Sequence, residues 1–150
     1  MSSPRWPFAM MLTGLALFVT SPAPTHAQSI SDAIDDVLDW LDEGYELVPE
    51  QGQWGLVFGW FAESEEKELR FTVTSGESYM IAGGGDANSE DLDICVYDQH
   101  GEELECDVLT DNYPLVSFTA AATGTYRAVL TAYALNGSTS YAGMAVLRER

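Results

Sequence analysis

Apolar and polar residues alternate with a period of two over most of the chain after residue 53. This is the period of a β-strand, in which successive side chains point to opposite faces of a sheet. Clusters of Gly, Asn, Asp and Ser, which are typical of turns, interrupt the alternation at short intervals. The pattern predicts an antiparallel β-sandwich of eight strands, at residues 54–63, 68–74, 78–82, 92–97, 103–108, 115–120, 124–133 and 140–148.

Residues 29–43 follow a different period, because their apolar residues recur at three- and four-residue spacing. This spacing gives one apolar stripe and predicts a single amphipathic helix, which Gly44 ends. The stripe consists of Ile30, Ile34, Val37, Leu38 and Leu41.

The first predicted strand is apolar on both faces. Val57 and Phe61 share one face, and Leu56, Phe58 and Trp60 share the other. Such a strand needs cover on both sides. We expect the N-terminal helix to cover the second face, and a partner protein is the alternative.

The first 27 residues have the layout of a cleaved secretory signal peptide. Arg5 precedes an apolar run from Phe8 to Val19, prolines then break the helix, and the segment ends at Ala27. The run is short for the ~30 Å of membrane hydrocarbon, so we expect no stable membrane insertion after cleavage. The expected organisation is a signal peptide at 1–27, a helix with a linker at 28–50 and a β-sandwich domain at 51–150, exported to the periplasm or medium.

The chain is strongly acidic, with 24 Asp and Glu residues against six Lys and Arg residues and a net charge of −18. Such a surface repels phosphate backbones, which excludes nucleic acid as a partner class. It permits cation binding, although solubility alone also explains an acidic surface.

Asp91 and Asp93 lie in one predicted strand, and their side chains project from the same face because they are two residues apart. Calcium takes six to eight oxygen ligands, in part carboxylates, and no other cofactor is indicated. A solvated acidic face is the commoner explanation of such a cluster, and a calcium site is the alternative. The candidate calcium ligands are Asp86, Asp91, Asp93, Asp107 and Asp111. The glycines at residues 83–85, ahead of Asp86, are interpreted as a flexible turn.

The chain has two cysteines, Cys95 and Cys106, which in an exported protein predict one disulfide. Closing a loop of this size would stabilise the fold by roughly 3 kcal/mol.

The turn between the cysteines leaves the strand register open. A type I turn at residues 98–101 with a glycine bulge sets Ile94 opposite Cys106, which puts the cysteines on opposite faces and forbids the bond. A two-residue turn at residues 100–101 opposes the cysteines but sets Val96 against Glu105. An irregular second strand that turns Cys106 round is the third possibility.

Several segments together resemble the bacterial pre-peptidase C-terminal domain: residues 71–81, 91–94, 97–98 with Gly101, 115–119 and 124–129. The resemblance covers about residues 55–147. It implies an exported, eight-stranded jelly-roll-like β-sandwich without catalytic residues. Members of this family commonly follow secreted peptidases, and some of them bind calcium or substrate polymers. No peptidase precedes the module here. We therefore expect it to act alone or through a partner.

The remaining candidate chemistry favours binding over catalysis. His100 is the one histidine after residue 27 and lies in a predicted turn, without a nucleophile motif or metal-ligand spacing around it. Trp54, Trp60 and Tyr113 are candidates for stacking on a ligand, although core packing explains aromatic residues more simply. We expect a non-catalytic module that binds an unidentified protein or polysaccharide, the alternatives being a carbohydrate-binding module or, less favoured, a carboxylate-dependent hydrolase.

Overall fold

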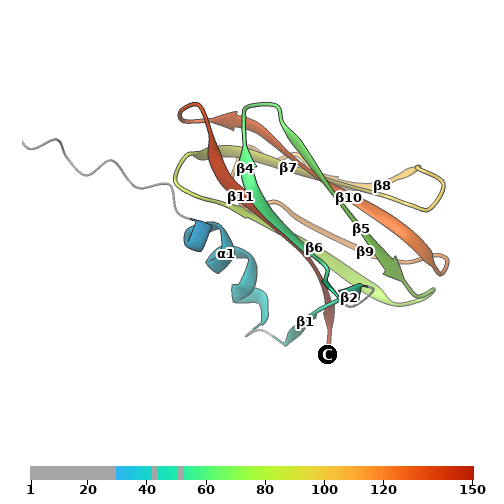
Figure 1. Ribbon diagram of the computed structural model, residues 1–150. Coiled ribbons are helices and arrows are strands. Elements are labelled where there is room, and N and C mark those ends of the chain that lie inside the picture. The colour runs from blue at the N-terminus through green and yellow to red at the C-terminus, as the bar shows by residue number, and fades with distance from the viewer. Residues whose placement is uncertain (1–29, 42–43, 51–52) are drawn as a thin grey trace, which may run out of the picture.

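Two antiparallel sheets face each other in a β-sandwich, and one helix packs outside it (Figure 1). The computed structural model describes residues 30–41, 44–50 and 53–150. Among these residues, no helix is both long and apolar enough to cross a membrane.

The first sheet, here called the disulfide sheet, has four strands. Their order is β5 (Glu66–Val73), β10 (Gly124–Leu135), β7 (Ser89–Tyr97) and β8 (Glu103–Asp107). The central strand β10 is bulged between Ala132 and Ala134, opposite the start of β7. The edge strand β8 continues into the loop that crosses to the other sheet.

The second sheet, here called the helix-side sheet, is built around β11 (Ser140–Glu149). One edge of β11 pairs with β6 (Ser78–Gly85), which in turn pairs with β9 (Leu115–Thr119). The other edge pairs first with β4 (Leu56–Phe61) and then with β1 (Tyr45–Leu47). Between β1 and β4, a short ribbon is formed by β2 (Pro49–Glu50) and β3 (Gln53–Trp54).

The predicted antiparallel sandwich is confirmed, and the eight predicted strands correspond in order to β4 through β11. The three strands that sequence reasoning missed, β1 to β3, are two or three residues long. Alternation cannot be recognised over so few residues. Because β1 pairs with β11, residues 45–47 belong to the sheet instead of to a linker.

The interpretation of residues 83–85 as a flexible turn is wrong, because these glycines form the end of β6 and pair with β11. Close packing between the sheets explains them. A Cβ atom on Gly83 would lie 2.8 Å from Cγ of Pro114 and 2.9 Å from Cδ1 of Ile94. Glycine lets the backbone of β6 approach these side chains where no other residue fits.

The main core lies between the two sheets. In β7, Leu92, Ile94 and Val96 are fully buried in it, as the period-two pattern predicted. Val57 and Phe61 of β4 face the same core. Burying one large apolar side chain at such a position stabilises the fold by about 1.5–3 kcal/mol. Together, these side chains make the main favourable contribution to folding.

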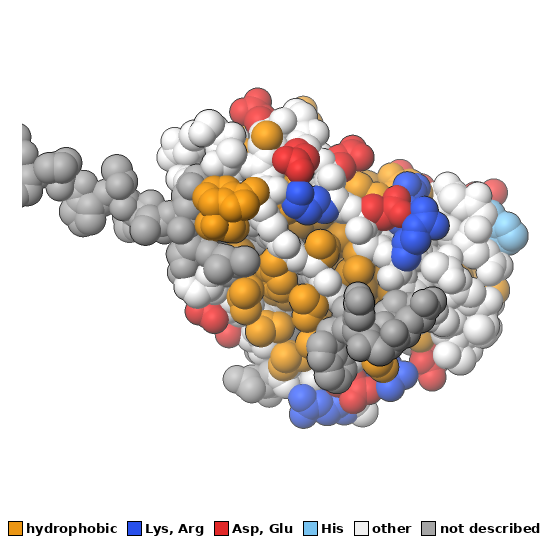
Figure 2. Space-filling model, viewed as in Figure 1, with side chains coloured by type: hydrophobic (Ala, Val, Ile, Leu, Met, Phe, Trp, Pro, Cys, Tyr) orange, Lys and Arg blue, Asp and Glu red, His pale blue; other side chains and the backbone are white. Residues whose placement is uncertain are grey.

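A second, smaller core lies on the outer face of the helix-side sheet, where α1 (Ile30–Leu38) and the short 3₁₀ helix η1 (Asp39–Leu41) pack. Val37 is fully buried there, and Leu56 and Phe58 of β4 contribute their outward side chains. Figure 2 shows apolar side chains gathered over this face, with charged side chains at its margin. The helix is shorter than residues 29–43.

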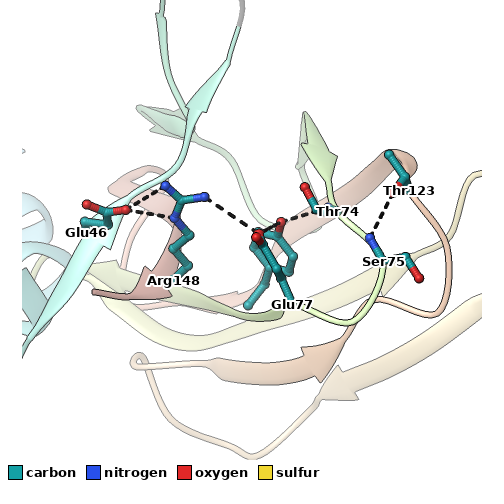
Figure 3. A network of polar contacts seen from close by, with 7 residues as sticks. Glu46, Thr74, Ser75, Glu77, Thr123 and Arg148 are labelled. Carbon is teal, nitrogen blue, oxygen red and sulfur yellow. Dashed lines mark hydrogen bonds and ion pairs between the residues drawn. The ribbon is translucent and has the colours of Figure 1, made fainter.

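A polar network attaches β1 to the remainder of the sheet (Figure 3). The guanidinium of Arg148 in β11 lies 2.8 Å from Oε1 of Glu46 and 3.7 Å from Oε2 of Glu77. The hydroxyl of Tyr79 donates a hydrogen bond to Glu77 and accepts one from the backbone N–H of Thr74. The hydrogen bond with Glu46 raises the pKa of Arg148 against a smaller opposing effect of burial, so the cation is maintained at any ordinary pH.

Candidate functional site

The β7–β8 hairpin begins with the predicted type I turn and glycine bulge. The N–H of Gly101 donates to the carbonyl of Asp98 over 3.1 Å, and the N–H of Asp98 donates to the carbonyl of Glu102 over 2.9 Å. Gly101 has φ +84°, a left-handed conformation that glycine adopts without strain. His100 lies at the exposed tip of this turn, where its N–H donates to Oδ1 of Asp98.

A second irregularity, within β8, resolves the register. Tyr97 pairs with Glu103 but Val96 pairs with Glu105, so Leu104 is an extra residue on the edge strand. The shift sets Cys95 directly opposite Cys106, with a Cα–Cα distance of 4.2 Å, and the predicted disulfide is confirmed. The irregular second strand is therefore the correct alternative. The register that the two-residue turn predicted at the cysteines, with Val96 opposite Glu105, is confirmed, but the turn itself is the one with the glycine bulge.

The loop from β8 to β9, residues 108–114, is held by the carboxylates at its two aspartates. Oδ1 of Asp107 accepts a hydrogen bond from the N–H of Leu109 over 3.1 Å, and Oδ2 accepts one from the N–H of Leu115 over 2.8 Å. Oδ1 of Asp111 accepts a hydrogen bond from the N–H of Tyr113 over 2.9 Å. The bonds from Leu109 and Tyr113 are short-range side-chain-to-backbone bonds that fix a turn, and the bond from Leu115 closes the loop onto the end of β8.

Backbone hydrogen bonds also fasten this loop to both sheets. The N–H of Leu92 in β7 donates to the carbonyl of Asp111 over 2.8 Å, and the N–H of Gly83 in β6 donates to the carbonyl of Pro114 over 2.8 Å. The loop therefore bridges the sandwich at its β8–β9 edge and has little freedom to move.

Four apolar side chains on or beside this loop point into solvent. Val108 is 65% exposed and Leu109 is 67% exposed. Tyr113 and Leu115 are also among the exposed large apolar residues. We call Val108, Leu109, Tyr113 and Leu115 the apolar loop. Tyr113 was already a candidate for ligand binding, but Val108 and Leu109 were missed because a single Val-Leu pair has no periodicity. Their place between two turn-forming aspartates was the available signal.

The surroundings of the apolar loop are acidic. Asp111 in the loop and Glu102, Glu103 and Glu105 in or just before β8 are exposed. The sequence contains no Lys or Arg between Arg70 and Arg127. Exposed apolar side chains and exposed acidic side chains therefore occur together in β8 and the loop that follows it.

Asp86, one of the candidate calcium ligands, is fully buried at the end of β6 and already bound on both oxygens. Its Oδ1 accepts from the N–H of Asn88 over 3.0 Å, and its Oδ2 accepts from the N–H of Tyr141 over 3.2 Å. These bonds link β6, the following turn and β11. The carboxylate of Asp86 therefore has a structural role within the fold.

Asp91 and Asp93, in contrast, are brought together on the outward face of β7. Partial burial and then repulsion from Asp91 and Asp107 raise the pKa of Asp93. Asp91 is only 8% exposed, and its Oδ1 accepts no hydrogen bond from the described part of the chain. Within residues 30–41, 44–50 and 53–150, the one group of three potential ligands lying within 4.8 Å of each other is Cys95, Glu103 and Cys106. Its two sulfurs are in the disulfide and cannot act as thiolate ligands.

Of the candidate stacking aromatics, Trp60 and Tyr113 lie at opposite edges of the helix-side sheet. Trp60 is 46% exposed on β4, at one edge of the helix-side sheet, and its ring centroid lies 3.7 Å from that of Tyr141. Tyr113 immediately precedes β9, at the opposite edge of that sheet. Trp54 lies in β3, and its side chain is outside the described residues.

No known protein family matches the sequence, and no curated protein matches it. Among solved structures, the chain is similar to a periplasmic inhibitor of g-type lysozyme from Aeromonas hydrophila, with 13% identity and a TM-score of 0.48. The match covers 62% of this chain and 84% of that chain. It is also similar to the pre-peptidase C-terminal domain of collagenase from Bacillus anthracis, with 14% identity, coverage of 61% and 86%, and a TM-score of 0.47.

A third similar structure is a carbohydrate-binding module of Cellvibrio mixtus lichenase 5A in complex with cellotriose, with 13% identity, coverage of 71% and 86%, and a TM-score of 0.36. A pre-peptidase C-terminal domain is thus among the solved structures to which the chain is similar. At these identities and TM-scores, the comparisons carry no information on ligand or partner.

Proposed function

We propose that this chain is an exported, non-catalytic binding module whose apolar loop docks on a protein partner with a basic surface. The observation that carries the proposal is the exposure of Val108 and Leu109 on a loop that is fastened to both sheets. Groups of exposed apolar side chains on a soluble protein are typical of surfaces that a partner covers.

The hydrogen bonds of the loop support a binding role because they reduce the cost of association. A loop that is ordered before it meets its partner loses little conformational freedom on binding. Asp107 and Asp111 provide this order through backbone N–H groups on the loop itself. The apolar side chains are therefore presented in one arrangement.

The charge around the loop supports the choice of partner. Acidic residues attract a partner whose docking site is rimmed by basic residues, and they repel acidic proteins. Export is supported by the disulfide, since such bonds persist in oxidising compartments.

The test is a capture experiment on the exported fraction of the native cell, with the full mature chain as bait. A Val108→Ser/Leu109→Ser variant should retain the fold, because both side chains are exposed. We expect it to lose the partner that the wild-type chain retains. Tyr133→Ser is the matched control, since Tyr133 is an exposed large aromatic on β10 and not part of this loop.

The partner identified in this way is then purified and its affinity measured by calorimetry. The loop variant should bind at least about tenfold more weakly, which corresponds to loss of about 1.4 kcal/mol. Equal capture by the wild-type chain and the loop variant would refute the proposal.

A carbohydrate-binding module is the second candidate, and one observation favours it. Trp60 is partly exposed and packed against Tyr141 on the outer face of the helix-side sheet. Aromatic faces of this kind can stack on a sugar ring. Glycan-array binding that Trp60→Ala abolishes and Val108→Ser/Leu109→Ser leaves intact would favour this candidate over the first.

A further inference from the structure

Residues 136–139 connect β10 to β11 and cross from the disulfide sheet to the helix-side sheet (Figure 1). Asn136 and Gly137 begin this connection, and both are exposed. Gly137 has φ +136°, and a Cβ atom at this position would meet nothing within 4 Å beyond its neighbours in the chain. The fold therefore leaves open space around the peptide bond that joins these two residues.

The side chain of Asn136 and the backbone nitrogen that follows it are both unrestrained. Within the described part of the chain, neither the side-chain amide of Asn136 nor the N–H of Gly137 has a hydrogen-bond partner. Asn136 is held through its backbone instead, because its N–H donates to the carbonyl of Asn88 over 2.8 Å. This bond fixes the start of the connection and leaves the side chain free to rotate towards the next nitrogen.

The other two asparagines of the sequence are held differently. The N–H that follows Asn112 donates to Oδ1 of Asp111 over 2.9 Å. The N–H that follows Asn88 donates to the carbonyl of Asp86 over 2.9 Å. Each of these nitrogens must give up a hydrogen bond before it can react, whereas the nitrogen after Asn136 has none to give up among the described residues.

We propose that Asn136 deamidates through a succinimide formed with Gly137, which makes the β10–β11 connection a site of spontaneous covalent modification. The deprotonated backbone nitrogen of Gly137 attacks Cγ of Asn136. The N–Cγ bond forms, the Cγ–Nδ2 bond breaks, and Nδ2 leaves as ammonia with a proton from water. One water molecule then opens the cyclic imide. Opening at Cγ gives an aspartyl residue, and opening at the backbone carbonyl carbon gives an isoaspartyl residue.

Glycine at the second position favours this ring closure, because no Cβ atom obstructs the attack and the backbone reaches conformations that other residues avoid. Water is the only other reactant. Each conversion replaces a neutral amide by a carboxylate, so the modified chain carries an additional negative charge. The isoaspartyl product also has an additional carbon in its backbone at the crossing between the sheets. This site does not depend on the proposed binding role of the apolar loop.

The experiment incubates the full mature chain in mildly alkaline buffer, folded and in guanidinium chloride. Digestion at acid pH, where ring closure is slow, is followed by peptide mass spectrometry that separates the aspartyl and isoaspartyl forms. In the folded chain, Asn136 should convert faster than Asn88 and Asn112 and should give both forms. Unfolding should accelerate the loss at Asn88 and Asn112 on the order of ten- to hundredfold, since it removes their hydrogen bonds, and the loss at Asn136 by less than about threefold.

Asn136→Gln is the matched variant, because its longer side chain would have to close a larger ring. Its amide should stay intact while Asn88 and Asn112 behave as in the wild type. An Asn136 that converts in guanidinium chloride but stays intact in the folded chain would overturn the proposal, since the fold would then protect it. A purely aspartyl product would also overturn it, because direct hydrolysis gives no isoaspartyl form. None of these results bears on capture by the apolar loop, so the two proposals fail independently.

Discussion

The carboxyl of Asp93 is held in surroundings that favour its protonated form. Partial burial, and then the charges of Asp91 and Asp107, raise its pKa above the ordinary value of 3.8. A carboxyl whose pKa is higher in the folded state stabilises the fold at pH below its unfolded-state pKa. That contribution is lost as the pH rises through the folded-state pKa. At neutral pH without a cation, this residue therefore opposes folding.

Asp93→Asn should therefore raise stability at pH 7 in the presence of EDTA, by up to about 1 kcal/mol, the scale of a like-charge contact on one sheet face. The gain should shrink as the pH falls towards 3.8, because the wild-type carboxyl is then protonated. Urea unfolding at a series of pH values measures both effects. A variant that is less stable than the wild type at pH 7 in EDTA would contradict the assignment of repulsion at this position.

At the scale of the element, the disulfide links the two strands of the β7–β8 hairpin, of which β8 is a bulged edge strand. Replacing Cys95 and Cys106 together by Ala should lower the free energy of unfolding by roughly 3 kcal/mol, because the unfolded chain is no longer constrained. Urea unfolding measures the loss. Unfolding of the wild type under reducing conditions should give a similar value, and a loss below about 0.5 kcal/mol would contradict the expectation.

The end of β6 depends on close approach between the sheets. Gly83→Ala should cost about 1–3 kcal/mol, because the added Cβ meets Pro114 and Ile94 in a packed core. Gly59→Ala is the control: its Cβ would meet the end of the Lys67 side chain at 3.1 Å, which can move aside. The two midpoints of thermal unfolding should differ clearly. Equal losses would mean that the loss of glycine itself, and not the contact, is responsible.

The strands β4 to β11 could be predicted from the sequence because each is long enough for the alternation of apolar and polar residues to be recognised. Sequence reasoning failed at residues 83–85, since a glycine needed for packing looks the same in sequence as a glycine needed for a turn. It placed Asp91 and Asp93 on one face, which depends only on their spacing. It could not find Val108 and Leu109, because their exposure depends on how Asp107 and Asp111 direct the loop.

At the scale of the whole molecule, the net charge of −18 acts in opposite directions on stability and on binding. Acidic residues repel each other in the compact fold, and the same charge attracts a basic partner. Raising sodium chloride from about 0.01 M to about 1 M shortens the screening length from roughly 30 Å to roughly 3 Å. In EDTA, the unfolding midpoint of the free chain should rise over this range, because the repulsion is screened.

Over the same range, the affinity for the partner captured by the apolar loop should fall, mainly through a slower association rate. Stopped-flow association at several salt concentrations measures it, and Val108→Ser/Leu109→Ser should change the dissociation rate instead. An affinity that is independent of salt would show that the acidic residues around the loop do not contribute to docking. The apolar side chains alone would then have to account for partner choice, which a patch of four residues could do only by fitting a matching pocket.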